Sequence, residues 1–97
     1  MRYEIVFAPE ALRDVQRLKA HLRSAVRDAI ETSLRYAPTQ VSQSRVKRLK
    51  GLSQPQFRLR EGEVRVFYDV GASTVEILAV VSKSGAAAWL KREGTAT

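Results

Sequence analysis

Three arginines lie in the stretch QFRLREGEVRVFYDV, where basic and apolar residues alternate. Side chains alternate between the two faces of a strand, so Arg58, Arg60 and Arg65 are expected on one face of a hairpin. One guanidinium group can donate two parallel hydrogen bonds to the oxygens of a phosphate. Neighbouring cations also repel one another unless an anion lies between them. The pattern therefore favours phosphate binding. The alternative is a solvated sheet face, partly neutralised by nearby acids. Those acids are Glu61, Glu63 and Asp69.

The positive charge of the chain is concentrated around these arginines. The 97 residues carry 17 Lys and Arg against 10 Asp and Glu, which gives a net charge of +7. Residues 45–65 hold seven bases and two acids, whereas residues 1–44 hold seven bases and five acids, and residues 66–97 hold three of each. A regional surplus of this kind indicates a polyanionic partner, either a nucleic acid or an acidic protein.

Composition also limits the chemistry. The chain has no cysteine and one histidine, His21, which excludes disulfides, thiolate metal sites and cysteine nucleophiles. We expect no metal and no cofactor. No apolar stretch approaches the length of a membrane span, and the opening MRYEIVF lacks a signal-peptide core. We therefore expect a cytoplasmic protein that does not bind membranes.

The strands that would position the arginines follow from period-two alternation. The pattern predicts a strand at residues 2–7, a hairpin at 57–70 that turns at Glu61 and Gly62, and a third strand at 74–82. Glycine can adopt the positive φ that a tight hairpin needs. The apolar residues expected to share one face of the third strand are Val75, Ile77, Ala79 and Val81.

Helical periodicity completes the fold prediction. Apolar residues at steps of three and four predict helices at about 9–19 and 21–36, and GAAAWLKREG predicts a short helix that ends at Gly94. The predicted order is β-α-α-β-β-β-α in a single α+β domain, residues 1–97. Its helix hairpin should pack on one face of a small antiparallel sheet.

Three aromatic residues are assigned mainly to packing. Tyr68 alternates with valines and is expected in the core, and Tyr36 is expected to pack near the end of the second helix. Trp89 has two alternatives, an apolar anchor in a core or interface, or a stacking surface for a base.

Together, these elements and residues resemble the RelE/ParE superfamily of type II toxins, small basic proteins encoded beside an acidic antitoxin. The resemblance covers nearly the whole chain and rests on FAPEALRDVQRL, RLKGL, FRLREGEVRVFYDV and VEILAVVSK. It implies a RelE-like fold with one of two activities. RelE-like members cut messenger RNA in the ribosomal A site, and ParE-like members inhibit DNA gyrase. The RLKGL run is closer to the RelE branch, an mRNA interferase that inhibits translation. A catalytically weakened RNA-binding member is a third alternative.

The resemblance also implies roles for individual residues. In RelE-like cleavage the ribose 2′-hydroxyl attacks the adjacent phosphate, which needs a base, charge stabilisation and an acid for the leaving 5′-oxygen. Lys50 is the candidate base, and no general acid is identified, since Ser84 stands where an arginine or histidine is expected and Trp89 or Leu90 falls near the expected tyrosine. The implied catalytic residues are Arg48, Lys50, Arg60, Arg65 and Lys83. The implied RNA-binding residues are Lys47, Arg58 and Trp89.

The resemblance implies partners as well. These are the ribosome with its mRNA, and a cognate acidic antitoxin that lies along the sheet and against the terminal helix. The expected assembly is a toxin–antitoxin heterotetramer that represses its own promoter.

Overall fold

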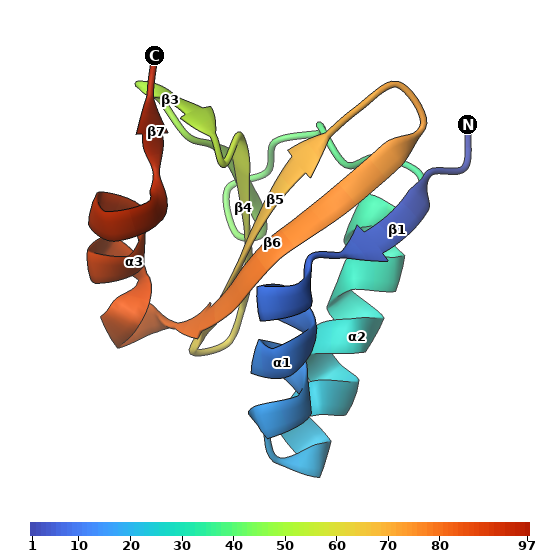
Figure 1. Cartoon of the computed structure of the whole chain (residues 1–97). Coiled ribbons are helices and arrows are strands. Elements are labelled where there is room, and N and C mark those ends of the chain that lie inside the picture. Colours follow the sequence, from blue (N-terminus) through green and yellow to red (C-terminus); the bar gives the residue numbers. More distant parts are fainter.

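The computed structural model describes all 97 residues and confirms the α+β class (Figure 1). No helix combines the length and the apolar character needed to cross a membrane. The elements are β1 (Glu4–Phe7), α1 (Pro9–Arg17), α2 (Ala20–Leu34), β2 (Val46–Arg48), β3 (Leu52–Gln54), β4 (Phe57–Glu61), β5 (Val64–Val70), β6 (Thr74–Ser82), the 3₁₀ turn η1 (Lys83–Gly85), α3 (Ala86–Glu93) and β7 (Thr95–Ala96).

The main sheet has five strands in the order β1-β6-β5-β4-β2. Strands β4, β5 and β6 pair antiparallel, as predicted, and β2 adds to β4 in the same sense, whereas β1 runs parallel to β6. The sheet is therefore mixed rather than wholly antiparallel. A tight hairpin forces antiparallel pairing, but the long connection between β1 and β6 leaves the direction of β1 free. The short strands β2, β3 and β7 were not predicted, because two or three residues show no alternation.

Helices α1 and α2 cover one face of this sheet (Figure 1). Pro9 begins α1 at a position where its missing N–H costs nothing. The apolar stripes of both helices meet the apolar strand residues on the sheet face opposite the arginines. The larger side chains in this core include Val15, Val26, Ile30, Leu34, Phe57, Leu59, Val66, Tyr68 and Ile77.

A β-bulge changes the faces of β6. Phe67 pairs with Ala79 but Tyr68 pairs with Ile77, so one extra residue lies between the two pairs on β6. The extra residue reverses the alternation. Val75 and Ile77 accordingly pack toward the helix hairpin, whereas Ala79 and Val81 belong to a separate cluster on the other face. The prediction that these four residues share one face was therefore wrong.

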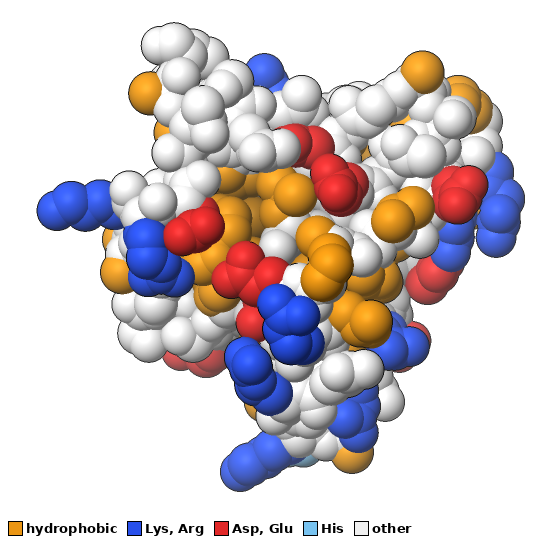
Figure 2. All heavy atoms as spheres, viewed as in Figure 1, with side chains coloured by type: hydrophobic (Ala, Val, Ile, Leu, Met, Phe, Trp, Pro, Cys, Tyr) orange, Lys and Arg blue, Asp and Glu red, His pale blue; other side chains and the backbone are white.

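Helix α3 covers part of the opposite sheet face. Trp89 is 5% exposed, and its ring stacks on Phe67 with a centroid distance of 5.0 Å and an interplanar angle of 7°. Figure 2 shows apolar side chains gathered in a hollow between α3 and the sheet. As predicted, α3 ends at Gly94, where a Cβ atom would lie 2.5 Å from the Leu90 carbonyl oxygen. Beyond it, β7 pairs with β3 and ties the end of α3 to the sheet region.

Candidate phosphate-binding face

Basic residues lie side by side on the sheet face opposite α1 and α2. Lys47 pairs with Arg58, Arg58 with Phe67, and Arg60 with Arg65 on the adjacent strands. We call the group formed by Lys47, Arg58, Arg60 and Arg65 the cationic face; Phe67 lies on the same side but is buried. Its arrangement confirms the prediction that Arg58, Arg60 and Arg65 share one side of the sheet.

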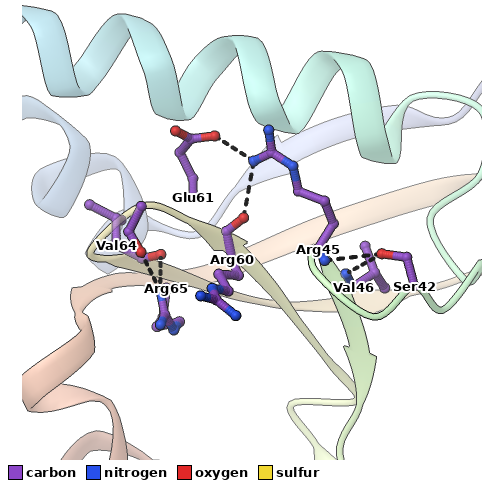
Figure 3. A network of polar contacts seen from close by, with 8 residues as sticks. Ser42, Arg45, Val46, Arg60, Glu61, Val64 and Arg65 are labelled. Carbon is purple, nitrogen blue, oxygen red and sulfur yellow. Dashed lines mark hydrogen bonds and ion pairs between the residues drawn. The ribbon is translucent and has the colours of Figure 1, made fainter.

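Two of the acids near the hairpin, Glu61 and Asp69, do not pair with the cations of this face. Glu61 points toward α2 and pairs with Arg45, which also donates to the Arg60 carbonyl oxygen at 3.1 Å, whereas the guanidinium of Arg60 points away from the helix (Figure 3). Asp69 accepts hydrogen bonds from the Gln54 side chain at 2.7 Å and the Gln56 amide at 2.8 Å. Two of the three carboxylates expected to compensate the cations are thus used elsewhere, and Glu63 is the third.

No residue of the cationic face takes part in an ion pair. The four ion pairs of the protein use Arg17, Arg35, Arg45 and Arg92. Arg58 is the most constrained cation, because its Nε is buried with no hydrogen-bond partner. Burial lowers the pKa of Arg58, and the neighbouring charges of Arg65 and Arg60 lower it further. A buried donor without a partner costs about 1–3 kcal/mol, which a bound anion would offset.

Arg65 is held within the hairpin. It is 6% exposed, and its Nη1 donates to the Gly62 carbonyl at 2.7 Å and the Val64 carbonyl at 3.1 Å. Gly62 has the positive φ, +56°, that was predicted for this turn. Arg65 therefore braces the turn and adds its positive charge to that of Arg58 from a fixed position.

Arg48 and Lys50 do not join this group. Arg48 lies over the ring of Phe57 at 5.1 Å, and Phe57 belongs to the core on the helix side of the sheet. The Leu49 amide donates to the Gln56 carbonyl, just before β4 begins. Lys50 therefore lies in the turn near the start of β4, whereas Arg60 lies near its end. Arg60 lies four residue steps along the chain from Gln56, roughly 13 Å at about 3.3 Å per residue. The structure thus separates residues that the sequence-based hypothesis had combined.

Lys83 lies at the hairpin end of the cationic face. Its backbone N–H donates to the Glu63 carbonyl at 2.7 Å. Lys83, Glu63, Ser82 and Ser84 line an open hollow of about 330 Å³. From its position in the sequence, Glu63 was expected only to neutralise neighbouring cations. Its position in the hairpin turn brings Glu63 into the hollow, because the next residue, Val64, pairs with Ser82.

The aromatic and histidine side chains lie away from the cationic surface or are buried. Tyr68 is fully buried in the core, as predicted, and its hydroxyl donates to the Pro38 carbonyl at 2.7 Å. Trp89 is the apolar anchor, and its burial against Phe67 contradicts the alternative of a base-stacking surface. His21 is exposed at the start of α2. Tyr36 is 64% exposed, so its expected packing was wrong.

Tyr68→Phe tests whether this hydroxyl is structural. Loss of the bond to Pro38 should lower the free energy of unfolding by about 1 kcal/mol near neutral pH, with no loss of activity. Burial raises the pKa of Tyr68, so the protein should lose stability as the pH rises above about 10, where unfolded tyrosine ionises. The Tyr68→Phe variant should lose less stability than wild type as the pH rises above about 10. Urea unfolding near pH 7 and above pH 10 measures both effects, with exposed Tyr36→Phe as the control. A folded but inactive Tyr68→Phe protein would instead indicate a catalytic hydroxyl.

Comparison with known families gives one match over most of the chain. The family model described as "ParE toxin of type II toxin-antitoxin system, parDE" matches residues 5–86. No curated protein sequence matches significantly.

Several solved structures share the fold. The toxin–antitoxin complex RelBE2 from Mycobacterium tuberculosis matches with a TM-score of 0.67 and 27% identity, covering 84% of this chain and 99% of the matched chain. The archaeal RelE–RelB complex from Pyrococcus horikoshii matches with a TM-score of 0.64 and 24% identity, covering 86% and 97%. A double arginine-to-alanine mutant of the Escherichia coli toxin RelE in the free state has a TM-score of 0.70 and 19% identity, covering 96% and 99%. The latter two likenesses show the fold alone.

Proposed function

Because the chain belongs to the ParE toxin family of type II toxin–antitoxin systems, within the RelE/ParE superfamily, we propose that it inhibits translation by cleaving messenger RNA on the ribosome. The observation that carries this proposal is the unpaired cationic face with the orphaned Nε of Arg58. A phosphodiester is the anion that such a face suits best, since guanidinium donors match its oxygens.

The cationic face would act mainly through charge. As the 2′-oxygen attacks phosphorus, negative charge grows on the non-bridging oxygens, and fixed donors stabilise it without reorganisation. Arg58 and Arg60 are the residues proposed to hold these oxygens, and Lys47 a neighbouring phosphate. Arg65, already fixed by the hairpin carbonyls, contributes its field. In this proposal Lys50 binds the RNA beyond the scissile bond, because it lies away from Arg60, whereas Arg48 lies on the helix side of the sheet and takes no part.

A ParE-like inhibition of DNA gyrase is the second candidate. It is favoured by the family model and by the positions of two side chains that could transfer a proton, since Tyr68 is buried in the core and His21 lies at the start of α2. The cationic face would then bind DNA or an acidic protein surface without cleaving it. A catalytically weakened RNA-binding protein would use the face in the same way.

An acidic antitoxin is the proposed partner of this chain. The similar structures from Mycobacterium tuberculosis and Pyrococcus horikoshii are toxin–antitoxin complexes. An acidic segment along the sheet and against α3 would offset the repulsion among the cations of the cationic face. A toxin–antitoxin heterotetramer acting in the cytoplasm, and repressing its own promoter, is the proposed assembly.

Arg60→Ala tests the proposed function directly. Wild-type protein should cut messenger RNA on programmed ribosomes, and the variant should cut about 100-fold more slowly, because one charge-stabilising donor is lost. Primer extension maps the cuts, and a gyrase supercoiling assay runs in parallel. Arg2→Ala is the matched control, since Arg2 is an exposed arginine in the segment before β1. Intact messenger at saturating toxin would rule out cleavage, and lost supercoiling in the same preparation would establish the gyrase alternative.

A further inference from the structure

The hollow beside the hairpin contains groups suited to proton transfer. Its four lining residues supply one carboxylate from Glu63, one ammonium from Lys83, and the hydroxyls of Ser82 and Ser84. The two hydroxyl oxygens lie 3.2 Å apart, and Ser82 also accepts a hydrogen bond from the Gly85 amide at 3.1 Å. The hollow is open and about 330 Å³ in volume, enough space for part of a nucleotide to enter.

The sheet register puts this hollow beside the arginines. Arg60 pairs with Arg65, Arg65 pairs with Val81, and Lys83 follows two residues later. On the hairpin side, Glu63 follows Gly62, whose carbonyl accepts the bond from Arg65 at 2.7 Å. The backbone bond from Lys83 to Glu63, also 2.7 Å, ties the two walls of the hollow together. Arg60, Glu63 and Lys83 therefore lie at the same end of the sheet, with Arg65 between Arg60 and the hollow.

Both charged groups are available for chemistry. Neither Glu63 nor Lys83 takes part in any of the four ion pairs, and both residues are exposed. Glu61, two residues earlier, is already engaged by Arg45. Glu63 is thus the carboxylate of this hairpin that is free to accept a proton beside the cationic face.

We propose that Glu63 is the general base and Lys83 the general acid of RNA cleavage, an inference that rests on the proposed function. The Glu63 carboxylate takes the proton of the ribose 2′-hydroxyl as the 2′-oxygen forms a bond to phosphorus. The bond between phosphorus and the 5′-oxygen breaks, and the Lys83 ammonium protonates that oxygen. The products are a 2′,3′-cyclic phosphate and a 5′-hydroxyl, and exchange with water restores both side chains.

This assignment replaces Lys50 as the base for two physical reasons. A lysine must lose its proton before it can accept one, whereas a carboxylate accepts a proton directly. In addition, a base must lie within hydrogen-bond reach of the proton that it removes. Lys50 lies beyond the other end of β4, whereas the hollow that Glu63 lines is at the hairpin end, where Arg60 pairs with Arg65.

The test is single-turnover cleavage of messenger on programmed ribosomes by wild-type protein and by Glu63→Gln, with Glu76→Gln as the matched control. Glu76 is an exposed glutamate on β6, away from the hollow. Glu63→Gln should cleave about 100-fold more slowly or worse, and its rate should no longer fall at acid pH as the wild-type rate does. Its affinity for the ribosome should be unchanged.

A modified substrate separates the acid from the base. A 5′-bridging sulfur is a leaving group that needs no protonation, so it should restore cleavage by Lys83→Gln but not by Glu63→Gln. Wild-type protein that cuts messenger, with Glu63→Gln within about threefold of the control, would overturn this inference and leave the proposed function standing. Wild-type protein that leaves messenger intact would overturn both, so the two failures are distinguishable.

Discussion

Trp89→Ala is expected to lower the free energy of unfolding by about 3–5 kcal/mol, the usual cost of truncating a large buried aromatic side chain. The indole is 5% exposed and forms a small core with Phe67 and Ala79, separate from the core under the helix hairpin. The other α3 residues that pack against this cluster, Ala86 and Leu90, are only partly buried. Because small domains have only about 5–15 kcal/mol of stability, this loss should approach complete unfolding.

Urea denaturation followed by circular dichroism measures the change, since the variant lacks the single tryptophan of the chain. Trp89→Phe should cost clearly less, because a smaller ring still stacks on Phe67. Tyr36→Ala is the surface control and should change stability by less than about 0.5 kcal/mol. In the Trp89→Ala variant, hydrogen exchange should be faster at the backbone amides of α3 than at those of β5. A Trp89→Ala protein within about 1 kcal/mol of wild type would contradict the anchoring role.

Arg58→Leu is expected to raise stability and to remove activity. The substitution eliminates a buried Nε without a partner and relieves repulsion with Arg60 and Arg65. We expect a gain of about 1 kcal/mol in the free energy of unfolding, because an unsatisfied buried donor is lost. The same change removes a donor for the phosphate, so messenger cleavage should fall about 100-fold.

Arg45→Leu is the matched control, because it removes an arginine from the same region that is paired with Glu61 on the helix side. It should leave the stability equal or lower and should keep most of the activity. Added salt should stabilise wild-type protein more than Arg58→Leu, since salt screens the repulsion among the arginines. An Arg58→Leu protein that is less stable than wild type, or that cleaves normally, would show that the orphaned donor is not reserved for an anion.

Local patterns predicted most of the elements correctly because they depend on neighbouring residues. The helix hairpin, the turn at Gly62 and the end of α3 at Gly94 all follow from periodicity and glycine chemistry. Periodicity did not predict the parallel direction of β1 or the reversal of faces beyond the bulge in β6. Both depend on pairing with strands far away in the sequence.

Local patterns likewise predicted only part of the candidate site. Alternation placed Arg58 and Arg60 on one face correctly, but it could not show that α3 covers part of that face. The same limit applies to the acids. Glu61 and Glu63 are equivalent in the sequence, yet the first pairs with Arg45 and the second lines the hollow with Lys83. That difference arises from the fold of the segments around β2 and η1.

The sequence by itself determined the fold class, the regional positive charge and the side of the sheet on which its arginines lie, because each is a property of composition or short-range period. Only the tertiary structure decided which charges are compensated and which are not, since a partner is set by strand register and helix packing. Register leaves Arg58 without a partner, separates Lys50 from Arg60, and brings Glu63 next to Lys83.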